Sequence, residues 1–141
     1  MNDAFIKMMK DSVSNQVRSE AEERGQLTLG MLKTELNKCH SDKPVVFDIG
    51  GYPFDTTSYR GYYDQLAIEP GEDQSSVKET IKLLEEAIGK EFTGYKGGTF
   101  RMNDYTMIWC SEYGTASGNA IIGIEEKEDK VIVLTQNTYN E

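Results

Sequence analysis

This chain has only four arginines, and two of them lie in segments rich in Tyr and Gly. Arg60 lies within Ser58-Tyr59-Arg60-Gly61-Tyr62-Tyr63, and Arg101 follows Gly94-Tyr95-Lys96-Gly97-Gly98. A guanidinium group binds phosphate or carboxylate through two parallel hydrogen bonds. Tyr offers a stacking face, and Gly lets a ligand approach the backbone. The pattern therefore predicts a site for a small anionic, aromatic ligand such as a nucleotide.

Each residue type in these segments has a distinct predicted role. Arg60 would contact a phosphate, Lys96 would add a point charge, and the N–H groups of Gly97 and Gly98 would form an anion nest. A tyrosine stacked on a base would contribute about 1–3 kcal/mol. The predicted ligand-binding residues are Tyr59, Arg60, Tyr62, Tyr63, Tyr95, Lys96, Gly97, Gly98, Arg101 and Tyr113.

A purely architectural interpretation of these segments stays open. Tyr and Gly are also common at strand edges and in tight turns, and Arg60 would then pair with a carboxylate. Tyr62 and Tyr63 are adjacent, so in a strand one of them would face the core. We expect Trp109 to be a core residue.

The usual signatures of enzymes are missing from the sequence. The single histidine, His40, adjoins Cys39, which is not the spacing of a metal site, and nothing indicates an activated Cys39 or Cys110. Asp48, Asp55, Asp64 and Asp104 could in principle surround a cation, although Asp near Gly and Pro more often forms turns. We expect no catalytic residue, no metal site and no cofactor.

The length and composition fit one soluble domain. The chain has 141 residues, 38% of them hydrophobic, and a net charge of −9. This charge argues against non-specific nucleic-acid binding, which needs a basic face. No apolar run approaches the ~20 residues that span a bilayer, and the N-terminus does not resemble a signal peptide. Two cysteines do not form a disulfide framework, so we expect a cytoplasmic protein.

The first half of the chain predicts two helices and a strand. Over residues 2–24, Phe5, Met9, Val13 and Val17 recur every four positions and give a narrow apolar stripe, which suits packing on a partner subunit or loosely on the body. A second helix is expected over 28–38, with Thr28 as N-cap and Leu27 and Leu32 as a staple. Val45–Ile49 reads as a strand that ends at Gly50-Gly51.

The second half predicts one helix and several strands. Residues 58–68 suggest two extended pieces, and Pro70–Asp73 suggests a turn. Ser76 and Glu79 predict a capping box for a helix that ends near Ile88, before Gly89. Strands are expected over 91–95 and 106–110, and a hairpin over 119–125 and 130–135. The expected class is α+β, with N-terminal helices, a central helix, a mostly antiparallel sheet and a C-terminal hairpin. The expected division is a helical extension over 1–26 and a single domain over 27–141.

The motifs over residues 27–135 resemble a family of small proteins encoded by tailed phages and prophages. The resemblance rests on Val45–Asp48, Ser58–Ala67, Phe92–Gly98 with Met102, and Tyr113-Gly114 with Ser117-Gly118. The type to which we relate this family is the first Thoeris anti-defence family. That resemblance implies a homo-oligomer that sequesters cyclic ADP-ribose-type signals or cyclic oligonucleotides between its subunits, without cleaving them. The chain has no arginine after Arg101, so it departs from the family if a contact arginine belongs in the last strands.

Three functions remain open at this point. The first is a sponge for a nucleotide immune signal in the host cytoplasm. The second is a direct protein inhibitor of a host defence or nucleic-acid enzyme, including an acidic mimic of DNA, although the carboxylates are spaced among lysines. The third, a small enzyme that acts on nucleotides, has the least support because His and a metal set are missing.

Overall fold

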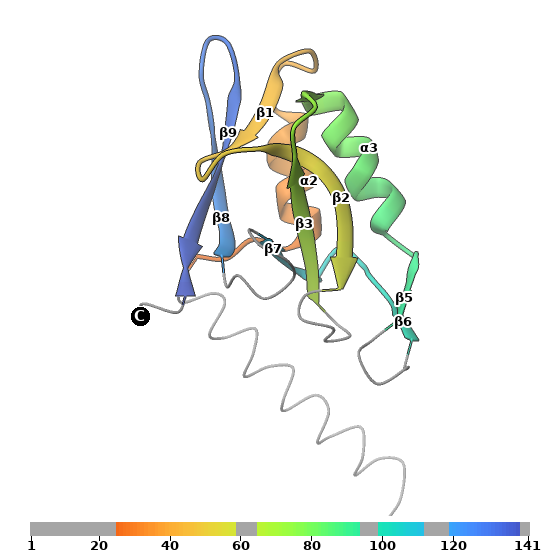
Figure 1. The fold of residues 1–141 in the computed structure, drawn as a ribbon. Coiled ribbons are helices and arrows are strands. Elements are labelled where there is room, and N and C mark those ends of the chain that lie inside the picture. The colour runs from red at the N-terminus through yellow and green to blue at the C-terminus, as the bar shows by residue number, and fades with distance from the viewer. Residues whose placement is uncertain (1–24, 59–64, 94–98, 112–118, 139–141) are drawn as a thin grey trace, which may run out of the picture.

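The computed structural model describes residues 25–58, 65–93, 99–111 and 119–138, which form an α+β body (Figure 1). The predicted helix over 2–24 lies outside the described residues. The described elements follow one another along the chain in this order: α2 (Leu29–Asn37), β1 (Pro44–Phe47), β2 (Tyr52–Ser58), β3 (Gln65–Gly71), β4 (Ser75–Ser76), α3 (Val77–Ala87), β5 (Glu91–Thr93), β6 (Thr99–Arg101), β7 (Met107–Cys110), β8 (Asn119–Glu126) and β9 (Val131–Asn137).

Most of the strands belong to one mixed sheet. Seven strands pair in the order β2-β3-β7-β8-β9-β1-β4, while β5 and β6 form a separate two-stranded sheet. The neighbours β3 and β7, and likewise β1 and β9, are parallel, and the other pairs are antiparallel. The predicted α+β class, mostly antiparallel pairing and C-terminal hairpin are confirmed.

The sheet curls until strands from its two ends approach each other. A turn of four residues joins β1 to β2, although four strands, β3, β7, β8 and β9, lie between them in the sheet order. Phe47 N–H donates to Gly51 O across this turn at 3.0 Å. Gly50 and Gly51 have φ values of 100° and 86°, which favour glycine. A Cβ on Gly51 would also lie 2.6 Å from the Cβ of Pro70 in β3. Figure 1 shows α2 between the β8–β9–β1 side and the β2–β3 side of the sheet.

The two described helices form as their cap residues predict. The Thr28 hydroxyl accepts from Met31 N–H at 3.2 Å, and Leu29, Leu32 and Leu36 bury the inner face of α2. In α3, Ser76 and Glu79 form the predicted capping box. Gly89, with a φ of 80°, follows α3 as predicted.

Alternate side chains along the strands belong to two different apolar clusters. The main core takes Ile108 and Cys110 from β7 and Ile121 from β8, together with the inner faces of both helices. The intervening residues Trp109 and Ala120 belong to a second, smaller cluster. Because successive side chains of a strand point to opposite faces, these two clusters lie on opposite faces of the sheet. The prediction that Trp109 is buried is confirmed.

Several sequence predictions miss strand boundaries. The strand predicted over Val45–Ile49 ends at Phe47, because Asp48 and Ile49 form the turn to β2. Strand β2 was not predicted, and its pairing with β3 extends β3 through Pro70 and Gly71, where a turn was expected. Proline fits β3 there because Pro70 lies opposite Pro53 at an irregular end of the ladder.

The outer end of the β8–β9 hairpin is fixed to the loop before β1. Glu126 Oε2 accepts from His40 N–H at 3.0 Å and lies 3.2 Å from Lys43 Nζ. The hydrogen bond from His40 and the Lys43 ammonium lower the pKa of Glu126. A lowered carboxyl pKa stabilises the folded state above the ordinary Glu pKa of about 4.3, and the effect is lost as pH falls through the folded-state pKa.

Glu126→Gln should therefore lower the melting temperature at neutral pH and lose its effect in acid. The measurement is thermal unfolding of the wild type and the variant from pH 7 to pH 3. Glu128→Gln, at the exposed turn of the same hairpin, is the control that should change the melting temperature little. A difference between wild type and Glu126→Gln that stays constant over this range would contradict the assignment.

Candidate ligand-binding region

Most of the predicted ligand-binding residues lie outside the described part of the chain. This applies to nine of the ten predicted residues: Tyr59, Arg60, Tyr62, Tyr63, Tyr95, Lys96, Gly97, Gly98 and Tyr113. Arg101, on β6, is the tenth. What the structure gives for the others is the position of the strands that flank them.

Arg101 is an exposed side chain with two neighbours on its own small sheet. Its guanidinium lies 3.3 Å from Glu91 Oε1 and donates to Gly89 O at 3.3 Å. Glu91 is its cross-strand partner in the β5–β6 ladder. An exposed ion pair of this kind contributes at most about 1 kcal/mol, so an anionic ligand could displace Glu91 at little cost. Arg101 therefore has a structural role and keeps donor capacity for a ligand.

The strands that flank the Tyr- and Gly-rich segments gather at one end of the body. Residues 59–64 connect β2 to β3, residues 94–98 connect β5 to β6, and residues 112–118 lie between β7 and β8. Strands β2 and β5 contact each other. In Figure 1, the ends of β2 and β5 and the start of β8 all lie on the lower side of the body. Segments distant in sequence thus start from the same lower side of the body in this view.

The sheet register gives an approximate distance between two of these attachment points, Gln65 and Asn119. Gln65 of β3 is opposite Met107, and Asn119 of β8 is opposite Cys110 on the same intervening strand. Two strand spacings and a three-residue offset place Gln65 and Asn119 about 14 Å apart. Residues 59–64 and residues 112–118 therefore connect to the sheet at opposite ends of β7, separated by about this distance.

An aromatic and polar pair lies between these attachment points. Trp109 Nε1–H donates to Gln65 Oε1 at 2.6 Å, and the tryptophan is 7% exposed. Its register partners on both neighbouring strands are alanines, Ala67 and Ala120. Trp109 packs with these two alanines and with Ile122 in the smaller apolar cluster.

Groups that could support catalysis lie apart from this end. Burial, assisted by the charge of Glu126, raises the pKa of the Cys39 thiol, which reduces its thiolate fraction at neutral pH. Asp48 accepts from the backbone N–H and the hydroxyl of Thr135 at 2.8 and 2.6 Å, and so holds the β1–β2 turn to β9. Among the described residues, no three His, Cys, Asp or Glu side chains are grouped to hold a metal ion. Asp64 lies outside these residues.

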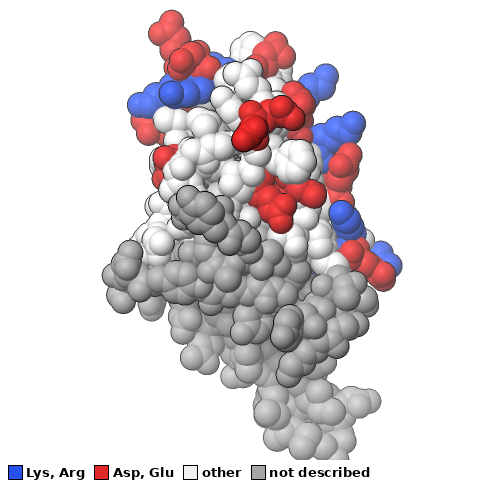
Figure 2. All heavy atoms as spheres, in the orientation of Figure 1, with Lys and Arg blue, Asp and Glu red and all other residues white. Residues whose placement is uncertain are grey.

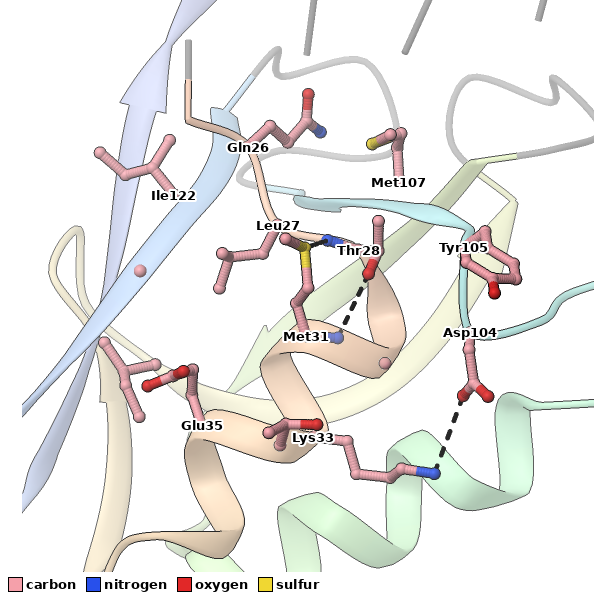
Figure 3. A pocket seen from close by; sticks show the side chains of 14 residues that line it. Gln26, Leu27, Thr28, Met31, Lys33, Glu35, Asp104, Tyr105, Met107 and Ile122 are labelled. Atoms are coloured by element: carbon pink, nitrogen blue, oxygen red, sulfur yellow. Dashed lines mark hydrogen bonds and ion pairs between the residues drawn. The ribbon is translucent and has the colours of Figure 1, made fainter. Parts of the chain in front are cut away.

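A groove of about 950 Å³ beside α2 was not predicted from the sequence (Figure 3). Asp104 and Tyr105 border one side of it, and β8 with Ile122 borders the other. Its apolar surface comes from residues of the pre-helix segment, α2, the β7 region and β8: Leu27, Met31, Tyr105, Met107, Ile122 and Ile124. Met31 is 52% exposed and Tyr105 is 68% exposed, an unusual degree of exposure for such large side chains in one place.

The segment before α2 forms part of this groove because it is inserted between two strands. Leu27 N–H donates to Ile121 O of β8 at 2.8 Å, and Leu27 O accepts from Ile108 N–H of β7 at 3.4 Å. Gln26 is buried, and its side-chain amide donates to Ile108 O at 2.8 Å. Residue 26, the predicted end of the N-terminal extension, is thus already part of the body.

The rim of the groove carries few charges. Lys33 Nζ lies 3.8 Å from Asp104 Oδ1, and Glu35 is the second carboxylate. The side chains of Lys33 and Asp104 are 27% and 62% exposed, so this pair is weak. The groove therefore suits a mainly apolar occupant better than a phosphate. Met31 and Tyr105 gave no signal in the sequence because each looks like an ordinary surface position of a helix or turn.

Comparison of the chain with known protein families, with curated proteins and with solved structures finds no match. Neither described helix has the length and apolar character that crossing a membrane requires.

Gly30→Ala should destabilise the protein, although Gly→Ala in a helix normally stabilises by about 1 kcal/mol. A Cβ at Gly30 would lie 2.9 Å from Asp104 Cβ and 3.0 Å from Asp104 O. We expect the overpacking to lower the free energy of unfolding by about 1–2 kcal/mol net. Urea unfolding measures the change, with Thr34→Ala on the exposed side of α2 as control. Increased stability of Gly30→Ala would show that Asp104 moves away freely.

Proposed function

We propose that this protein binds a small anionic nucleotide signal, of the cyclic ADP-ribose or cyclic oligonucleotide type, and sequesters it without cleavage. The protein would thereby oppose an immune system of the host cell. The observation that carries the proposal is the gathering, at one end of the body, of the strands that flank the Tyr-, Arg- and Gly-rich segments.

The proposal combines this placement with the chemistry of the residues in those segments. Arg60, Lys96 and Arg101 supply positive charge in an otherwise acidic protein, and the tyrosines supply stacking faces. A sponge acts by mass action, so it must hold the signal below the threshold of its receptor through tight binding and slow release. A rigid sheet that presents several connecting segments to one ligand supports such binding.

Arg60→Ala should raise the dissociation constant for the ligand roughly 10- to 100-fold, because a charge-assisted hydrogen bond contributes about 1.5–3 kcal/mol. The measurement is native mass spectrometry of the protein with cyclic ADP-ribose and with a cyclic dinucleotide, followed by denaturation to recover the ligand. Lys78→Ala, which removes an exposed cation from α3, is the control.

The recovered ligand should be intact, and the Lys78→Ala variant should bind it as the wild type does. Unchanged affinity of Arg60→Ala would remove Arg60 from the site. Failure of the wild type to retain any nucleotide from these ligands or from lysates that contain such signals would contradict the sponge. Recovery of a hydrolysed product would indicate an enzyme instead.

A second candidate, a direct inhibitor that binds a basic surface of a host enzyme, is favoured by one observation. Asp55 of β2 lies directly opposite Glu69 of β3, and neither strand contains Lys or Arg. Like charges in this arrangement destabilise a sheet. Within the described residues, neither carboxylate forms an ion pair. Figure 2 shows acidic groups in the middle of the described part of this face and basic groups toward its edges.

Under this alternative, the double variant Asp55→Asn/Glu69→Gln should lose a salt-sensitive complex with a host protein. The same variant should be more stable than the wild type by about 0.2–1 kcal/mol, because the repulsion is removed. Co-purification at low and high salt measures the first effect. Glu128→Gln/Asp129→Asn, with the same charge change at the β8–β9 turn, is the control. Equal recovery of a host protein by both double variants would contradict this role of the face.

A further inference from the structure

We propose that a pocket between β2 and α3, which we call the β2–α3 pocket, binds an arginine side chain on the surface of a partner protein. The pocket has a volume of about 380 Å³ and is lined by Pro53 and Phe54 of β2, by Asp73–Ser75 and by one side of α3. The proposal does not depend on the nucleotide ligand, because this pocket contains none of the ten residues predicted to bind that ligand.

Phe54 supplies an exposed aromatic ring whose position is set by the strand. The register between β2 and β3 shifts between Pro53 and Asp55, so Phe54 is the extra residue of a β-bulge. Its side chain lies against Gly71, because a Cβ at position 71 would be 2.7 Å from Phe54 Cβ and 2.9 Å from Phe54 Cγ. Phe54 is nevertheless 62% exposed. The bulge thus places a large apolar group in the lining of a pocket, where a partner can cover it.

The charged groups of the pocket are mostly carboxylates. Asp73 lies in the segment before β4, and one side of α3 contributes Glu79, Glu86 and a single cation, Lys82. The two glutamates lie about 10 Å apart along the helix axis. Within the described residues, none of these four side chains forms an ion pair, although Glu79 Oε1 accepts from Ser76 N–H at 3.4 Å. The pocket therefore has an excess of negative charge that the described body does not neutralise.

An aromatic ring together with carboxylates fits a guanidinium group better than other ligands. The excess of carboxylates repels a phosphate. Among the described residues, no three His, Cys, Asp or Glu side chains are grouped to hold a metal ion. A guanidinium is planar, so it can stack on an aromatic ring and donate hydrogen bonds to carboxylates at the same time. A lysine ammonium is more strongly hydrated and has no face to stack.

The pocket suits the side chain of a protein better than a free small molecule. Its volume lies at the small end of the range for ligand pockets, about 300–1,000 Å³. A protein surface around the arginine would also cover the exposed Phe54 ring, and aromatic side chains and arginine are enriched in interfaces. The acid pair of Asp55 and Glu69 follows on the same two strands, so negative charge extends beyond the pocket. A basic protein surface matches both features, whereas a single small cation matches only the pocket.

Amide chemical shifts of the full-length, 15N-labelled protein test this assignment. The probes are blocked pentapeptides with a central arginine, lysine or uncharged citrulline between glycines, titrated at low ionic strength. The arginine peptide should shift the amides of Phe54, Asp73 and Glu86. The lysine peptide should bind about 3-fold more weakly because it loses the stacking contact, and the citrulline peptide should leave these amides unchanged.

Two substitutions and a matched control locate the binding. Glu86→Gln removes a carboxylate from the pocket and should weaken binding of the arginine peptide about 5-fold, the upper range for an exposed ion pair. Phe54→Leu keeps an apolar side chain without the aromatic face and should weaken binding about 3-fold. Glu85→Gln, the same charge change at the adjacent residue of α3 outside the pocket, should bind as the wild type does. The same spectra show whether each variant is folded, and Glu86→Gln keeps the test decisive if Phe54→Leu does not fold.

Each outcome of the titrations supports or overturns the proposal. Shifts confined to the pocket, together with weaker binding by Glu86→Gln than by Glu85→Gln, support it. Equal affinity for the arginine and lysine peptides, or equal effects of the two glutamate substitutions, would show only a general attraction of cations and would overturn it. Free arginine that binds as tightly as the peptide would overturn the assignment to a protein partner. Unchanged pocket amides at millimolar arginine peptide would overturn the site itself, whether or not the protein retains a nucleotide.

Discussion

The insertion of a short backbone segment between β7 and β8 is the contact on which the described body depends. These two strands pair directly at only two positions, Trp109↔Ala120 and Cys110↔Asn119. Beyond them the strands diverge, and Leu27 bonds to both, through Ile121 O and Ile108 N–H. An unpaired N–H or C=O inside a protein costs about 1–3 kcal/mol, so this insertion keeps a seven-stranded sheet continuous where its own strands do not meet.

The same insertion positions both regions of interest. It leads into Thr28, the N-cap of α2, and the inner leucines of this helix fill the curled sheet. It also leaves Met31 exposed at the groove. On the other side, the pairing of β7 with β3 and with β8 holds Trp109 between Ala67 and Ala120. The proposed nucleotide site and the groove therefore share a framework, although their chemistry differs: the first needs cations and aromatic faces, and the second has a mainly apolar lining.

Acidic and basic side chains lie in different areas of the described surface. The acidic pair of Asp55 and Glu69 lies on a face without strand-borne cations, while Arg101 lies on the separate β5–β6 sheet. Because the chain has a net charge of −9, its few cations gain importance for any anionic ligand. The exposed ion pair with Glu91 orients the Arg101 guanidinium, but the pair is weak, so an anionic ligand can compete with Glu91.

The sequence by itself determined the local structure. The caps at Thr28 and Ser76, the stop at Gly89 and the C-terminal hairpin were predicted because each depends on residues close together in the chain. Tertiary structure decided what depends on distant partners: strand β2, whose pairing carries Pro70 and Gly71 into β3, and the insertion of Leu27. Of the candidate site, the sequence supplied the residue types, and the fold placed Arg101 beside Glu91 and gathered the flanking strands. The groove could not be predicted, because it comes from segments that approach one another only after the sheet has curled.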